Sequence, residues 1–174
     1  VLSTAALMSS VPIFGPDPRV DMLVDADGDG IGDYAIAELA IGRVAARVDV
    51  FSGRDDRRLW RVEHPFSSLF GQALAGRLDV NGDGKPDLVM TAPRSSLYGS
   101  VYAYDHQGRM LYAANSTAAL AFGDRGNAEC IGVVGDLDRD GCDDYVVGGA
   151  DSRRVSGGEG AAVVLSGRTG KVLQ

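Results

Sequence analysis

Short apolar runs alternate with turn-forming and charged segments along the whole chain. Three of these runs, at residues 34–37, 88–91 and 145–148, contain four residues each. A continuous apolar run of this length is too short for a helix and is typical of a strand that is covered on both faces. Glycine is abundant, with 24 residues, and supplies turns between many short strands. The pattern predicts an all-β chain.

A hairpin is predicted after each apolar run. The order strand, tight turn, strand recurs in residues 48–60, 101–112 and 162–173. Gly108 and Gly170 hold the same place in the turn, which Asp56 fills in the first copy. Aspartate is one of the few residues besides glycine that tolerate a left-handed backbone, so it is compatible with the same turn.

An acidic motif of constant form stands before each apolar run. It reads DADGDGIGDY from Asp25, DVNGDGKPDL from Asp79 and DLDRDGCDDY from Asp136, and the copies begin 54 and 57 residues apart. A repeat of this length, with one supersecondary unit per copy, is typical of a propeller or a similar array.

Each repeat is therefore predicted to be a blade of four antiparallel strands. The first strand precedes the acidic motif, at 19–24, 71–78 and 130–135, and the other three follow it. The predicted organisation is an N-terminal segment at 1–18, blade 1 at 19–68, blade 2 at 69–127 and blade 3 at 128–174. The three form one propeller domain or part of one.

Three interpretations of the acidic motif were compared. A solvated acidic turn does not require Asp or Asn at positions 1, 3, 5 and 9 of every copy, nor glycine at position 6. An EF-hand requires a glutamate at position 12 and flanking helices, but position 12 is Ile36, Met90 and Val147. The remaining interpretation is a calcium loop between strands, with side chains 1, 3, 5 and 9 and the carbonyl of residue 7 as oxygen ligands.

This interpretation predicts three calcium sites. Their ligands are Asp25, Asp27, Asp29, Ile31 and Asp33 in the first loop; Asp79, Asn81, Asp83, Lys85 and Asp87 in the second; and Asp136, Asp138, Asp140, Cys142 and Asp144 in the third. Magnesium fits less well because it requires a tighter octahedron and retains waters. Three calcium ions would change the formal charge from −7 to −1. The negative charge also argues against nucleic acid or an anionic membrane as a partner.

Residues 69–93 resemble the FG-GAP repeat of integrin α-subunit propellers and their bacterial relatives. They contain Phe70-Gly71, the acidic loop, and Thr91-Ala92-Pro93 in the place of Gly-Ala-Pro. Outside the loops the other repeats depart from this signature, with AELA at 37–40 and GGAD at 148–151. The resemblance implies blades whose first strands line a central axis, with calcium on one face and partner-binding loops on the other.

A propeller closes with about 4–8 blades, so three blades predict further ones. We expect a longer chain to supply them, or two copies to close a ring. We also expect the two outer sheet faces of an isolated copy to be apolar, because nothing in the repeats covers both.

The function expected from the resemblance is a calcium-stabilised binding or adhesion module, extracellular, at the cell surface or periplasmic. A protein or glycan ligand is expected on the face opposite calcium, at loops 62–68, 92–100, 115–128 and 150–160, with Arg153 and Arg154 as candidates for an acidic partner. The alternative is the propeller domain of a carbohydrate-active enzyme of the polysaccharide lyase type, or a lectin. No residue pair indicates a catalytic site, and His64 and His106 are the only histidines.

Of the two cysteines, Cys130 precedes the third acidic loop and Cys142 stands at position 7 within it. A disulfide between them is one possibility in an oxidising compartment. The other is a pair of free thiols, with Cys130 buried in the first strand at the position of Ala73.

Overall fold

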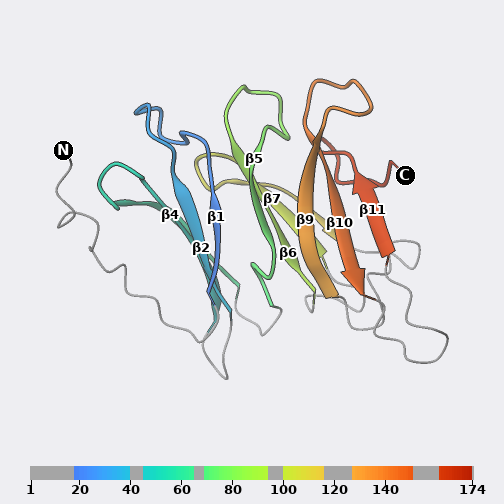
Figure 1. The fold of residues 1–174 in the computed structure, drawn as a ribbon, viewed down its shortest axis with the longest axis horizontal. Helices are drawn as coiled ribbons and strands as arrows, with labels where there is room; N and C mark the ends of the chain where they lie inside the picture. Colours follow the sequence, from blue (N-terminus) through green and yellow to red (C-terminus); the bar gives the residue numbers. More distant parts are fainter. Residues whose placement is uncertain are drawn as a thin grey trace.

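The computed structural model describes residues 18–39, 45–64, 69–93, 100–115, 127–150 and 161–173. In these residues the chain forms eleven strands in three antiparallel sheets, which confirms the all-β class and the blade-like units. Figure 1 shows the sheets side by side in chain order. Within the described ranges there is no helix that could span a membrane.

Each sheet follows the order of the chain. The first contains β1 (Arg19–Met22), β2 (Tyr34–Glu38), β3 (Ala46–Phe51) and β4 (Arg58–His64). The second contains β5 (Leu74–Leu78), β6 (Asp87–Ala92), β7 (Ser100–Tyr104) and β8 (Met110–Asn115). The third contains β9 (Asn127–Gly135), β10 (Asp144–Ala150) and β11 (Ala161–Leu165). Where the third sheet was expected to have a fourth strand, Val172 forms an isolated bridge with Leu165.

The three hairpin turns share the predicted left-handed residue. The φ angle is 58° at Asp56, 79° at Gly108 and 64° at Gly170. The middle turn is one residue shorter, because the Gly108 amide donates to the carbonyl three residues earlier, whereas Asp56 and Gly170 donate to the carbonyl four residues earlier. Aspartate therefore replaces glycine at the cost of modest strain.

Two hydrophobic clusters join the sheets. In the first, Ala35, Ala37, Val48 and Val50 of the first sheet pack with Leu88, Met90 and Tyr104 of the second. In the second, Val89, Val101 and Ala103 of the second sheet pack with Tyr145, Val147 and Leu165 of the third. Because successive residues of a strand point to opposite faces, the second sheet is covered on both sides, and all six residues of β6 are buried.

One of the two outer faces differs from the expectation. On β10 the side chain of Val146 points away from the second cluster and is half-buried, as is its β11 partner Val164, so this outer face is apolar. The outer face of the first sheet is mixed. Tyr34 stacks on Phe51 there, but Asp49 is also on this face and is paired with Arg61 at 2.6 Å. The prediction of two apolar faces is thus wrong for the first sheet, where β3 carries charged residues between its apolar ones.

The Phe-Gly signature fastens the second sheet to the first. Gly71 has φ 83°, its amide donates to the carbonyl of Thr91 at 2.9 Å, and a Cβ there would lie 2.6 Å from that of Ala37. Phe70 is buried and stacks on His64 with ring centroids 5.3 Å apart. A backbone passing this close to a neighbouring sheet requires glycine.

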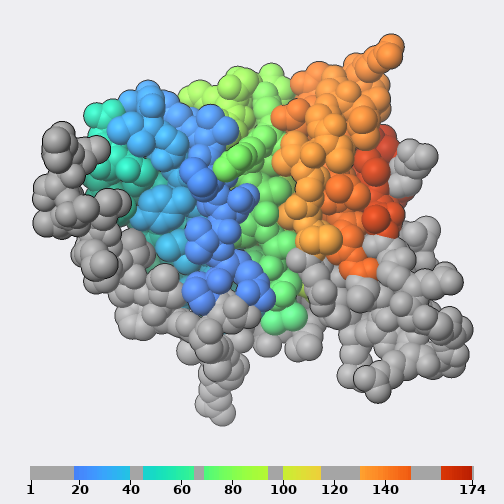
Figure 2. Space-filling view, viewed as in Figure 1, coloured from blue at the N-terminus to red at the C-terminus, as the bar shows by residue number. Residues whose placement is uncertain are grey.

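The first strands of the three sheets lie next to one another, and Figure 2 shows blue β1, green β5 and orange β9 across one face. The amide of Gly76 on β5 donates to Asp21 of β1 at 2.9 Å. Grooves of about 370 and 500 Å³ lie on this face, and each is lined by residues of β1, β5 and β9. Val20, Met22 and Val133 are exposed along this face.

Candidate metal centre in three acidic loops

The three acidic loops occupy equivalent places in the fold. Each connects the first strand of a sheet to the second, and all three emerge at the same edge of the molecule, at the top of Figure 1. The chain turns sharply within each loop because the residues at positions 4 and 6 have a left-handed backbone. These are Gly28 and Gly30, Gly82 and Gly84, and Arg139 and Gly141, with φ between 64° and 87°. The sequence pattern predicted the turn residue at position 6 but not the one at position 4, because position 4 is arginine rather than glycine in the third copy.

The aspartate at position 1 organises each loop. Asp25 accepts the amides of Gly28 and Gly30 at 2.6 and 2.7 Å. Asp79 accepts those of Gly82 and Gly84 at the same two distances. In the third loop Asp136 accepts the amides of Asp140 and Gly141, both at 3.0 Å. A carboxylate that accepts several backbone amides fixes the loop around itself.

The aspartate at position 5 bends the chain in the same way in all three copies. Its Oδ1 accepts the amide two residues later, at 2.9 Å in each loop: Asp29 from Ile31, Asp83 from Lys85, and Asp140 from Cys142. The amides of position 7 are thus placed by the structure. The proposed role of the carbonyls of Ile31, Lys85 and Cys142 as ligands stays a prediction.

The aspartate at position 9 is buried and binds the start of its own loop. Asp33, Asp87 and Asp144 are each at most 1% exposed. Asp33 accepts the amide of Ala26 at 2.7 Å, and Asp87 and Asp144 accept the equivalent amides at 2.9 and 2.7 Å. Burial, together with the charges of Asp83 and Asp79, raises the pKa of Asp87 to about 7. The surroundings of Asp87 in the protein therefore disfavour the ionised form of this carboxyl group.

Carboxylate oxygens converge in the first and third loops. Ligand atoms of Asp25, Asp27 and Asp29 all lie within 4.8 Å of one another, and so do those of Asp136, Asp138 and Asp144. Hard oxygen donors at this spacing fit Ca²⁺, which accepts ligands in flexible geometry. These groups include the predicted positions 1, 3 and 5 in one loop and 1, 3 and 9 in the other. In the second loop Asn81 replaces one carboxylate, and its Nδ2 donates to Asp87 at 3.3 Å.

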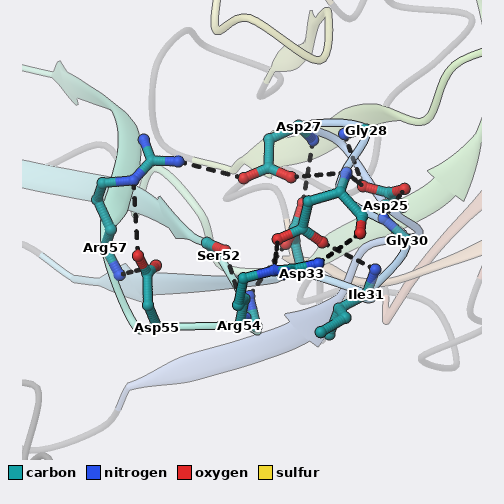
Figure 3. Close-up of polar contacts among 12 residues, drawn as sticks. Asp25, Asp27, Gly28, Gly30, Ile31, Asp33, Ser52, Arg54, Asp55 and Arg57 are labelled. Atoms are coloured by element: carbon teal, nitrogen blue, oxygen red, sulfur yellow. Dashed lines mark hydrogen bonds and ion pairs between the residues drawn. The ribbon is translucent and has the colours of Figure 1, made fainter.

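Two arginines contact the acidic loops, and neither was predicted to lie near a loop. Arg54 lies in the hairpin between β3 and β4, and its Nε and Nη2 donate to Oδ2 and the carbonyl of Asp29, at 2.5 and 2.6 Å (Figure 3). Arg168 after β11 makes the same two bonds to Asp140, at 3.1 and 2.6 Å. Desolvation raises the pKa of Asp29, but the hydrogen bonds from Arg54 and the Ile31 amide, together with the charges of Arg54 and Arg57, outweigh it and hold the pKa below its usual value. The signal that could have revealed this contact is the repeated Ser-Gly-Arg at 52–54 and 166–168.

The glycine before each arginine permits the contact. A Cβ on Gly53 would lie 2.0 Å from the carbonyl oxygen of Gly32, and one on Gly167 would lie 1.8 Å from that of Asp143. The amide of Gly53 donates to Oδ1 of Asp33 at 3.0 Å, and that of Gly167 donates to Asp144 at 2.9 Å. The hairpin therefore packs directly under position 8 of the loop.

The second loop lacks this arrangement. His106 stands where the other hairpins have glycine, Gln107 stands where they have arginine, and the turn is shorter by one residue. Nδ1 of His106 lies 3.6 Å from Oδ2 of Asp83, beyond a hydrogen bond. The backbone of His106 is held from the first sheet, since Nε1 of Trp60 donates to its carbonyl at 3.0 Å.

The other sequence-predicted features have mixed outcomes. Cys130 and Cys142 are both free, and Cys130 is exposed rather than buried, because none of the described strands covers β9 at that position. Cys142 is buried in the third loop. The expected ligand-binding segments, including Arg153 and Arg154, lie largely outside the described residues. The strand ends from which they start, such as Ala92 and Ala150, are at the edge opposite the acidic loops.

The chain matches a family model described as an FG-GAP-like repeat over residues 79–147. Integrin alpha-V from Gallus gallus is 29% identical over 144 residues, which are 74% of this chain and 14% of that protein. Integrin alpha-7 from Homo sapiens is 36% identical over 87 residues, 47% of this chain and 7% of that protein. The chain thus spans only a small part of these relatives.

Solved structures with this fold include two rhamnogalacturonan lyases. The exotype rhamnogalacturonan lyase YesX aligns with a TM-score of 0.57 and 21% identity over 88% of this chain and 29% of that chain. The Bacillus licheniformis rhamnogalacturonan lyase PL11 aligns with a TM-score of 0.52 and 18% identity over 89% of this chain and 39% of that chain. At these identities the likeness concerns the fold. The sequence matches, the repeated acidic loops and the Phe-Gly signature all agree with FG-GAP-like repeats, and the family model itself covers residues 79–147.

Proposed function

We propose that the chain is a calcium-stabilised binding module whose three acidic loops hold structural calcium ions. One observation carries this proposal: the same loop geometry recurs three times, with a position 1 aspartate that accepts the amides of its own turn. In the first and third loops further carboxylates converge on the same place. Solvated acidic turns have no reason to repeat that geometry. Calcium would supply the positive charge that the loop carboxylates lack, and its binding free energy would add to the stability of the blades.

The residues of each loop shape the site and supply its ligands. Position 1 holds the turn together, position 9 fastens the loop to the following strand, and positions 3 and 5 complete the donor set. The strands on either side supply rigidity. Calcium is structural in this proposal and takes part in no reaction.

The test is a thermal melt in EDTA, in calcium and in magnesium. Calcium at millimolar concentration should raise the melting temperature more than magnesium does, because the loops offer flexible oxygen ligands. Asp79→Ala should reduce the gain from calcium, and Arg109→Gln, a hairpin substitution away from the loops, should leave that gain unchanged. Equal melting temperatures in EDTA and calcium would contradict the proposal.

The expected partner is a protein or glycan bound at the edge opposite the loops, in an extracellular, cell-surface or periplasmic setting. The matches to integrin α-subunits support an adhesion role of this kind. The proposed further partner is another set of blades, from a longer chain or a second copy, on the apolar outer face of the third sheet.

The alternative function is a propeller domain of a carbohydrate-active protein. The fold likeness to rhamnogalacturonan lyases favours rhamnogalacturonan as the polysaccharide to examine. Retardation of the protein in gels that contain this polysaccharide would support the alternative. Formation of unsaturated sugar ends would show turnover, whereas binding without turnover would indicate a lectin-like module.

A further inference from the structure

The first and third acidic loops are each held by a hairpin arginine. Arg54 and Arg168 contact the position 5 aspartate with the same two donors, Nε to the carboxylate and Nη2 to the carbonyl. Isolated surface ion pairs contribute little and vary in geometry. The bidentate contact recurs in two repeats, and in both the arginine follows a glycine at which a side chain would overlap the loop. This recurrence indicates that the two hairpins serve the same role.

We propose that Arg54 and Arg168 are tethered cations that stabilise the first and third loops without calcium and lower the affinity of these loops for it. The inference rests on the proposed calcium function. It concerns how strongly each loop binds, which the loop sequences alone do not indicate.

Two effects of the arginine oppose each other. If the carboxylate of Asp29 bound calcium, the guanidinium on its Oδ2 would lie about 5–6 Å from the ion. This distance is the sum of the lengths of a hydrogen bond and a coordination bond. At this distance, and in a dielectric near that of water, repulsion between one and two positive charges lowers affinity about tenfold. In the other direction, an arginine that orients the carboxylate could raise affinity.

The second loop decides between the two effects. Asp83 accepts the amide of Lys85 at 2.9 Å, as Asp29 accepts that of Ile31, although Gln107 stands where the other two hairpins have an arginine. The backbone therefore orients the position 5 carboxylate without help. Orientation by arginine adds little, and repulsion is the larger effect.

The first loop has a second cation. Nη2 of Arg57 lies 3.3 Å from Oδ2 of Asp27, at position 3. Two hairpin arginines thus face four aspartates in the first loop, and one faces the four predicted ligand aspartates in the third, where the charges of Arg139 and Asp143 offset each other. In the second loop Asn81 leaves three aspartates, with His106 as the nearest hairpin group to Asp83. The first loop is accordingly the weakest calcium site of the three.

The test compares Arg54→Gln and Arg168→Gln with wild type in calcium titrations by calorimetry and in thermal melts in EDTA. In each variant one site should bind calcium about tenfold more tightly, and the EDTA melting temperature should fall. The opposite signs distinguish a competing cation from a positioning group, whose loss would lower both. Unchanged or weaker calcium binding would overturn the inference.

Two controls separate charge from geometry. Arg109 is a hairpin arginine of the second sheet that pairs with Asp105 at 2.6 Å and contacts no loop carboxylate there. Arg109→Gln should lower the melting temperature and leave calcium affinity unchanged. Arg54→Lys keeps the charge and should retain the weak site, and a gain in affinity equal to that of Arg54→Gln would refute the charge argument. If wild type binds no calcium, the proposed function itself fails, whereas normal binding with no effect of either arginine refutes only this inference.

Discussion

Gly53 is the position at which the hairpin and the first loop come closest, so Gly53→Ala tests this contact most directly. The added Cβ would lie 2.0 Å from the carbonyl oxygen of Gly32 and 3.1 Å from its carbon. Both belong to the backbone and have no rotamer that could avoid the overlap. The hairpin must therefore move away from the loop by at least about 1.4 Å to reach ordinary contact.

The cost has two parts. Overpacking of a close contact costs about 1–3 kcal/mol. The displacement also breaks the bond from the Gly53 amide to the buried Asp33, which is 3.0 Å long. A hydrogen bond to a charged group contributes about 1.5–3 kcal/mol. Together these predict a loss of about 3–5 kcal/mol, or a fall of about 10 °C in melting temperature for a chain of this size.

The assay is thermal unfolding followed by circular dichroism in EDTA, with Gly84→Ala as the matched control. Gly84 has φ 78°, but a Cβ there would meet nothing within 4 Å. Its substitution should therefore cost only the left-handed strain, about 1–2 kcal/mol. If Gly53→Ala melts no lower than Gly84→Ala, the hairpin does not pack under the loop as described.

Four other predictions follow from the structure. Elemental analysis after dialysis against calcium should find three ions per chain, and one or none would refute the three-site proposal. Without denaturant, Cys130 should react with a thiol reagent and Cys142 should not, because burial also raises the pKa of the Cys142 thiol; two protected thiols would contradict this. Burial raises the pKa of Asp105, but hydrogen bonds from Arg109 outweigh it and leave the pKa below its usual value. The ionised Asp105 therefore contributes its full stability above about pH 5, and this contribution is lost as the pH falls through the folded pKa. Asp105→Asn should flatten the acid side of a plot of the urea unfolding midpoint against pH. An unchanged slope of this plot would refute the assignment. Light scattering in calcium should show self-association through the third sheet, and Val146→Glu should abolish it, whereas a wild-type monomer would contradict a second copy as partner.

The blade-like units could be predicted because their signals are local. A four-residue apolar run after an acidic turn indicates a buried strand, and left-handed turns require glycine or a substitute such as Asp56. The position 1 and position 9 aspartates stood out for the same reason, since they accept amides of the same loop; their role as calcium ligands stays a prediction.

Contacts between segments far apart in the chain could not be predicted. The position of Arg54 over Asp29 depends on a hairpin 25 residues later, and its meaning is visible only when the hairpin lies against the loop. The charged outer face of the first sheet was missed because strand alternation indicates which residues share a face but not whether that face is covered. Cys130 was expected to be buried by analogy with Ala73, but burial depends on a neighbouring sheet rather than on the strand itself.

The two outer faces give the row of sheets a direction. The outer face of the third sheet is apolar at Val146 and Val164, whereas that of the first sheet carries the ion pair of Asp49 and Arg61. In a head-to-tail addition the apolar face of one unit would meet the mixed face of the next, so the added unit would have to present apolar side chains to Val146 and Val164. Such heterologous contacts generate closed rings or open filaments, so the angle between neighbouring sheets decides which of the two assemblies forms.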